Sequence, residues 1–194
     1  MSELASYAGL GIRHILAPDA LDHLLFLLVL VAPYRAAQWR HLLVVASAFT
    51  VGHSITLALA AGGVLWLPTS LIEFLIPLTI VITGLANVRR LGRVPGGREA
   101  PLLAAGFGLI HGAGFANVLR DLLGAPAAAP LLGFNLGVEL GQIVVLAAAL
   151  LLLTGLDRVL VRMRPLAPVR LRTGVTSVAA AAGAAFMAAG RLPW

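Results

Sequence analysis

Apolar stretches long enough to cross a lipid bilayer follow one another along nearly the whole chain. A membrane-spanning helix needs about 20 mostly apolar residues. The 194-residue chain is 60% hydrophobic and 11% charged, whereas a soluble domain carries about 25% charged residues. The pattern predicts an all-α fold, a polytopic membrane helical bundle with about six transmembrane helices in a single transmembrane domain over residues 1–194. The predicted spans cover residues 19–34, 41–62, 69–88, 101–123, 129–154 and 172–190, and a helix over 4–16 leads into the first.

Pro18 divides the first apolar region of the chain. Proline lacks a backbone donor and clashes with the preceding helical turn, so a helix usually stops before it. We therefore predict a broken N-terminal helix, made of a short helix, a break and a span. Non-helical backbone inside a membrane is tolerated only against protein or a water-filled cavity. The stretch from His14 to His23 is therefore a candidate mouth or site.

All fourteen basic residues are arginines, and the formal net charge is +6. Eleven of them lie in, or directly beside, three of the five segments between the predicted spans. This asymmetry indicates membrane topology, because cytoplasmic loops are enriched in basic residues, and it argues against nucleic-acid binding. It predicts a multi-pass protein with the three arginine-rich loops in the cytoplasm and both termini outside. The N-terminal segment has no basic region, so no cleaved signal peptide is expected.

Four of the five histidines and several carboxylates lie inside or against the apolar stretches. A charged group near the bilayer centre costs roughly 2.5–3.5 kcal/mol on insertion scales, so several such groups indicate a shared task. Imidazoles together with carboxylates favour a transition-metal ion, and the sequence contains no cysteine for a thiolate site. The candidate metal ligands are His14, Asp22, His23, His53, His111 and Glu139, with Asp19, Glu73, Asn135 and Gln142 as supporting polar residues.

Several of these candidates also have a purely structural interpretation. Asp19 and Asp22 stand near a helix start, where a carboxylate is favourable by up to ~1 kcal/mol, and His14 could be an interfacial histidine. A buried glutamate could be protonated and simply hydrogen-bonded. Against this, one polar stripe in an otherwise apolar span is formed by Asn135, Glu139 and Gln142, at spacings of four and three residues.

The polar residues lie in motifs over residues 11–16 (GIRHIL), 22–26 (DHLLF), 49–54 (FTVGHS), 107–116 (FGLIHGAGFA) and 135–142 (NLGVELGQ), with Glu73 and Asn87 between them. Together these motifs resemble the HupE/UreJ family of bacterial membrane proteins, which is associated with hydrogenase and urease accessory functions. The resemblance implies a small permease of the bacterial cytoplasmic (inner) membrane. Nickel is the expected ion, because hydrogenase and urease both need it; zinc, cobalt and copper are the other candidates. It also implies contact with nickel-enzyme assembly proteins.

We interpret the chain as a membrane permease for a divalent transition-metal ion. His23, His53 and His111 would bind the ion, while Asp22 and Glu139 would offset its charge or exchange protons with it. One alternative is a membrane-embedded metal-dependent hydrolase, because three histidines and a glutamate also suit a metal-bound water. Another is a metal-delivery partner of a metalloenzyme that does not transport. Beyond the metal ion and the lipid bilayer, the small-residue faces permit a second copy of the chain as a partner.

Overall fold

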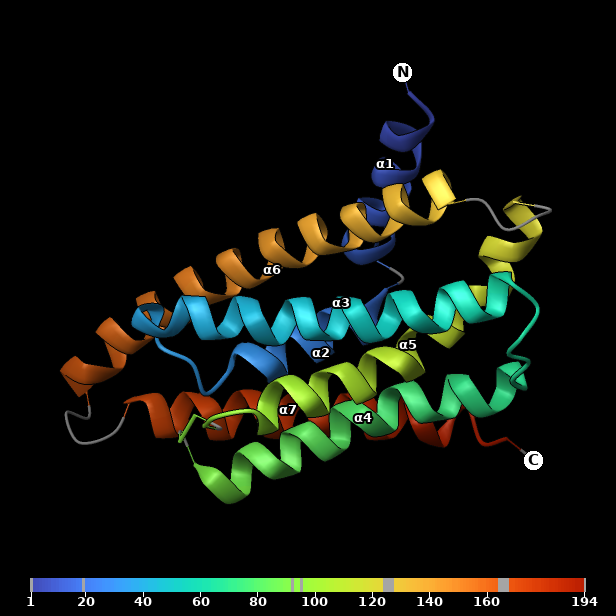
Figure 1. Ribbon diagram of the computed structural model, residues 1–194. Helices are drawn as coiled ribbons and strands as arrows, with labels where there is room; N and C mark the ends of the chain where they lie inside the picture. Colours follow the sequence, from blue (N-terminus) through green and yellow to red (C-terminus); the bar gives the residue numbers. More distant parts are fainter. Residues whose placement is uncertain are drawn as a thin grey trace.

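The computed structural model describes residues 2–18, 20–91, 93–94, 96–123, 128–163 and 168–193, and the elements within these ranges are helices without strands. This confirms the all-α prediction. Figure 1 shows the long helices lying along one another in a bundle, with α1 projecting beside the start of α6. In chain order the elements are α1 (Glu3–Leu16), α2 (Leu21–Val31), the 3-10 helix η1 (Ala36–Gln38), α3 (Trp39–Ala61), α4 (Thr69–Arg90), α5 (Glu99–Leu123), α6 (Ala128–Met163) and α7 (Pro168–Ala189).

The bundle has the length and hydropathy of a multi-pass membrane protein. Four helical stretches are each long and apolar enough to cross a membrane, namely α3 with η1, α4, α6 and α7. The bent pair of α1 and α2 adds a fifth if its two parts form one span. The remaining predicted span corresponds to α5, a helix of 25 residues that packs along α3. The membrane bundle is thus confirmed, and its count of about six helices is approximate.

The N-terminal helix is broken beside Pro18, as predicted. α1 ends at Leu16, α2 begins at Leu21, and the two helices are bent by 73° relative to each other. Asp19 lies outside the described residues, so its supporting role stays a prediction. The bend lets α1 lie against α6 while α2 contacts α4 and α7. It therefore brings His14 and His23 to the interior from two different directions.

Glycines let two helix pairs meet at the backbone. A Cβ added at Gly52 of α3 would lie 2.0 Å from a carbonyl oxygen of α5, and one at Gly112 of α5 would lie 2.4 Å from the His53 carbonyl oxygen. On α6, a Cβ at Gly137 would lie 2.0 Å from the Ala8 carbonyl oxygen of α1. Small residues at helix interfaces allow this close approach inside a membrane, so larger side chains here would push the helices apart.

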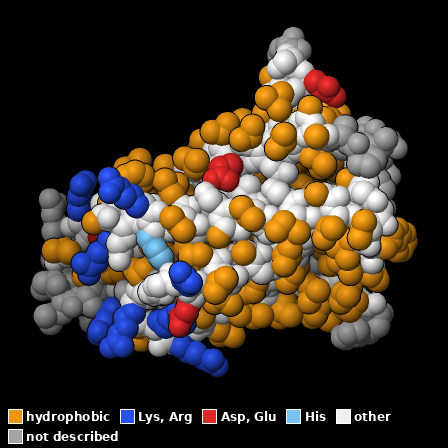
Figure 2. Space-filling view, viewed as in Figure 1, with side chains coloured by type: hydrophobic (Ala, Val, Ile, Leu, Met, Phe, Trp, Pro, Cys, Tyr) orange, Lys and Arg blue, Asp and Glu red, His pale blue; other side chains and the backbone are white. Residues whose placement is uncertain are grey.

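Arginine side chains gather at one end of the bundle, as the left side of Figure 2 shows, while both chain ends lie toward the other side in Figure 1. One arginine at this end is buried. Arg172 of α7 is 2% exposed, donates to the Tyr34 carbonyl oxygen and has its Nε 3.0 Å from Asp157 Oδ1 of α6. The sequence pattern predicted a connection over residues 155–171 between the last two spans, and that connection was too long. Hydropathy falls there, but arginine is a good helix former, so α6 continues to Met163 and α7 begins at Pro168.

Candidate metal centre

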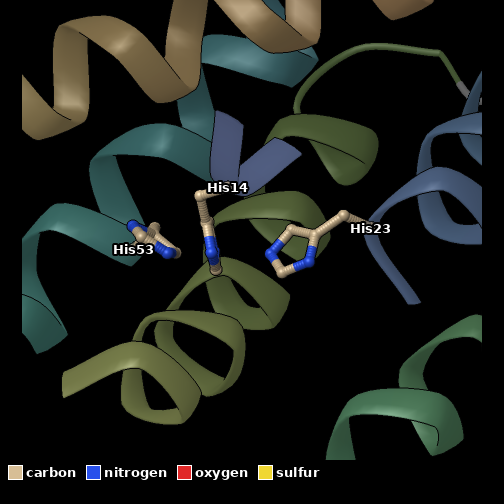
Figure 3. A group of neighbouring side chains, drawn as sticks. All are labelled: His14, His23 and His53. Atoms are coloured by element: carbon tan, nitrogen blue, oxygen red, sulfur yellow. The ribbon is translucent and has the colours of Figure 1, made fainter. Parts of the chain in front are cut away.

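Three histidine side chains from three helices converge in the interior of the bundle. His14 of α1, His23 of α2 and His53 of α3 each offer a ring nitrogen, and these nitrogens all lie within 4.8 Å of one another. Figure 3 shows the His14 ring between the other two; its centroid is 4.6 Å from that of His23 and 6.3 Å from that of His53. Two nitrogens on one ion lie no more than about 4.2 Å apart, so small side-chain movements would let one ion contact all three.

His111 of α5 places a fourth imidazole beside this group. Its ring centroid lies 5.3 Å from that of His23, and its Nε2 lies 3.0 Å from Thr79 Oγ1 of α4. Thr79 donates its only hydroxyl hydrogen to the Ile76 carbonyl oxygen at 2.7 Å, so the hydroxyl oxygen accepts from His111 Nε2. The lone pair of His111 is then on Nδ1. That atom is buried and has no hydrogen-bond partner among the described residues, which leaves it available to an ion.

Asp22 orients the neighbouring His23. Its Oδ1 accepts from the His23 backbone nitrogen at 2.8 Å and from the ring Nδ1 at 2.9 Å. The lone pair of His23 is therefore on Nε2, which is buried and unpaired within the described part of the chain. A carboxylate behind a histidine ligand fixes its tautomer and raises its basicity. Asp22 thus holds the His23 ring in one orientation through Oδ1.

His53 is fully buried, at 0% exposure. Neither ring nitrogen makes a hydrogen bond of regular geometry to another described residue. The Asn135 side chain of α6 approaches the ring closely enough to interact, but its amide nitrogen donates to the Leu131 carbonyl oxygen at 2.9 Å. A buried polar group without a partner costs free energy, so an ion bound between these imidazoles would offset that cost.

A cavity of about 460 Å³ leads to this group of histidines. The exposed Glu73 of α4 and Arg191, which follows α7, line it together with the candidate ligands. His53 is not part of the lining and lies deeper than the cavity. The complete lining is His14, Ala17, Ala20, Asp22, His23, Glu73, Ile76, His111, Gly114, Phe115 and Arg191.

The polar stripe of α6 divides in the structure. Glu139 accepts a hydrogen bond of 2.5 Å from the Ser47 hydroxyl of α3, and the buried Gln142 accepts one of 3.0 Å from Thr50. Neither side chain belongs to the lining of the cavity or to the three-histidine group. The structure therefore brings the four histidines, Asp22 and Glu73 to one place, leaves Asn135 beside His53, and separates Glu139 and Gln142 from them.

Two residues of this centre were not singled out in the sequence. Thr79 is an uncharged residue in an apolar helix, so its type alone does not indicate a site. Only the nearby Pro77 could have drawn attention to it, because threonine hydroxyls often bond to backbone carbonyls in proline-containing helices. Arg191 stood out only as an arginine away from the three arginine-rich segments. Its NH1 lies 3.8 Å from Asp22 Oδ2, a contact that depends on how α2 and the end of α7 meet.

Asp22→Asn is expected to weaken equilibrium metal binding by about 10–100-fold, the usual cost of losing a carboxylate behind a histidine ligand. The variant keeps the side-chain size but loses the charged acceptor for His23. Nickel titration of the purified protein in detergent, followed by calorimetry, measures the change. Glu99→Gln is the matched control, because Glu99 is exposed and pairs with Arg90 in a solvated contact. Parental affinity in Asp22→Asn would contradict the positioning role.

The family model for the HupE / UreJ protein matches residues 1–189, nearly the whole chain. The chain belongs to the HupE/UreJ family. No curated protein and no solved structure shows a significant match to it. For this HupE/UreJ protein, family membership suggests a membrane protein that handles metal ions, and the convergent histidines supply a group that could hold one.

Proposed function

We propose that this HupE/UreJ protein is a membrane permease for a divalent transition-metal ion, with nickel as the first candidate substrate. One observation carries the proposal: ring nitrogens of His14, His23 and His53 lie within 4.8 Å of one another beside a cavity. Neutral imidazole suits nickel, zinc and copper. The association of the family with hydrogenase and urease, which both need nickel, supports nickel as the first candidate among them. The substrate would be held by nitrogen ligands and helped by the nearby carboxylates.

The histidines form a row that suits movement of an ion. His111, His23 and His14 line the cavity, whereas His53 lies behind them. An incoming ion would first meet His111 Nδ1 and His23 Nε2, and would then be passed toward His14 and His53. Conduction requires binding that is loose enough for release. A row of ligands that bind in turn supports exchange better than a single closed cage does.

We further propose that the arginine-rich end faces the cytoplasm of a bacterial inner membrane and that both termini lie outside. The positive-inside rule supports this orientation, and the termini lie away from the arginine-rich end (Figure 1). Arg191, close to the C-terminal end of α7, lines the cavity. In this orientation the cavity would open toward the outer side of the membrane.

Uptake of radioactive nickel into sealed proteoliposomes tests the proposal. Saturable uptake by the parent protein is the expected result, with cobalt, zinc, copper and manganese as competitors that rank its ions. An embedded hydrolase would instead retain a bound metal with an open position for water, and a delivery partner would bind metal without flux. Tight binding with no uptake would therefore reject the permease in favour of one of these two.

Glu139 enters the proposal as a group that exchanges protons rather than one that holds the ion, because it pairs with Ser47 away from the histidines. Glu139→Gln is expected to change equilibrium nickel affinity by less than about twofold, equivalent to ~0.4 kcal/mol. Calorimetric titration of the variant beside the parent protein measures this. A loss of tenfold or more would restore Glu139 as a direct metal ligand.

A further inference from the structure

We propose that Arg191 is a tethered cation that occupies the free oxygen of Asp22 and thereby lowers the affinity of the cavity for incoming metal ions. This inference rests on the proposed function and concerns the same cavity. It assigns a role to a residue that none of the metal-binding motifs contains. Arg191 would act as a competitor of the substrate at the cavity rather than as a ligand.

The position of Arg191 supports this role. It follows the end of α7 at Ala189, and its side chain lines the cavity with Asp22, His23 and His111. The guanidinium NH1 lies 3.8 Å from Asp22 Oδ2. Because Asp22 Oδ1 already accepts two hydrogen bonds from His23, Oδ2 is the oxygen that an arriving cation could still approach. Arg191 stands at that oxygen.

The charges around the cavity set Arg191 and an incoming metal ion in competition for the same acidic side chains. Among the described residues that line it, Asp22 and Glu73 are acidic and Arg191 is basic, which gives −2 + 1 = −1 with neutral histidines. Replacing Arg191 with a neutral residue would make this local charge −2. The guanidinium and an arriving metal cation carry like charges and repel each other. The effective dielectric near a protein surface weakens this repulsion less than bulk water does. A divalent ion would therefore bind more tightly once the guanidinium is gone.

The contact is also weak enough to be displaced. The Arg191 side chain is 36% exposed, and its NH1 lies 3.8 Å from Asp22 Oδ2. Ion pairs that solvent can reach are loosely held. The long arginine side chain can swing into solvent when an ion reaches Asp22. The pair of Arg172 and Asp157 at the other end of the bundle differs, because the Arg172 side chain is only 1% exposed and has no solvent to swing into.

The test is nickel titration of purified Arg191→Gln beside the parent protein in detergent. The variant is expected to bind nickel about tenfold more tightly, and Arg191→Lys, which keeps the charge, is expected to stay near the parent. Arg40→Gln is the matched control, because Arg40 is exposed at the arginine-rich end. Raising ionic strength from about 0.05 M to about 0.5 M shortens the screening length, so it should narrow the difference between Arg191→Gln and the parent.

Unchanged affinity in Arg191→Gln would overturn the inference, and weaker binding would show that Arg191 helps to position Asp22 instead. Thermal unfolding of each variant identifies any that fail to fold. If Arg191→Gln fails to fold, nickel titration of Arg191→Lys in low and high salt tests the inference instead. The proposed function fails separately: tighter binding in Arg191→Gln without uptake by the parent protein would reject the permease and keep the inference. A parent protein that binds no nickel, cobalt or zinc would overturn both.

Discussion

His53→Ala is expected to abolish saturable nickel uptake and to weaken equilibrium binding by more than about 100-fold. Losing even a group behind a metal ligand typically costs about 10–100-fold in affinity, and removing a ligand should cost more. His53 is the deepest member of the three-histidine group and has 0% exposure, so no water-exposed group can easily replace it. Uptake into proteoliposomes and calorimetric titration measure the two effects.

His41→Ala is the matched control for this experiment. Its ring packs beside Tyr34, with centroids 5.8 Å apart, and it takes no part in the three-histidine group. It should retain parental uptake. Circular dichroism and thermal unfolding confirm that His53→Ala is folded before its uptake is interpreted. Uptake by a folded His53→Ala at the parental rate would mean that ions do not pass between these histidines.

Gly52→Ala is expected to destabilise the protein by about 1–3 kcal/mol or more, the usual range for overpacking. The added Cβ would lie 2.0 Å from the Ala105 carbonyl oxygen and 3.1 Å from the Leu109 backbone nitrogen. Because both neighbours are backbone atoms, no side-chain rotation can make room, and α3 must move away from α5. A lower unfolding midpoint in mild detergent, recorded by circular dichroism, measures the effect.

Gly106→Ala on α5 provides the comparison for Gly52→Ala. A Cβ at Gly106 would meet nothing within 4 Å, and glycine in a helix is less favourable than alanine by roughly 0.5–1 kcal/mol. This variant should therefore be neutral or slightly more stable than the parent. Equal losses in the two variants would show that the close contact between α3 and α5 is not what Gly52 preserves.

Much of the fold follows from local features of the sequence. The apolar stretches predict the helices because a membrane leaves few alternatives for the backbone, and Pro18 predicts the break between α1 and α2. Helix ends were harder to predict. The connection before residue 172 was predicted too long because hydropathy does not register a buried arginine that pairs with Asp157 and donates to the Tyr34 carbonyl oxygen.

The sequence predicted the types of residue in the centre more accurately than it predicted which of them lie together. Spacing along a predicted span gives the depth of a side chain, but an apolar helix with little asymmetry does not reveal its rotation about its axis. Glu139 has a depth compatible with the histidines, yet the rotation of α6 turns it to Ser47. His14 was uncertain for a related reason, since its place beside His23 depends on the 73° bend. The contact of Arg191 with Asp22 joins distant parts of the chain, so no local sequence pattern predicts it.

The glycine contacts described above divide the bundle into pairs that resist sliding within themselves. His53 and His111 belong to the pair of α3 and α5, His14 belongs to the pair of α1 and α6, and His23 is carried by α2 beyond the break. A shift between pairs would separate His14 from His53 without distorting any helix. An ion held by these side chains would therefore act as a removable cross-link between the pairs, added to the hydrogen bonds from Ser47 and Thr50 of α3 to α6.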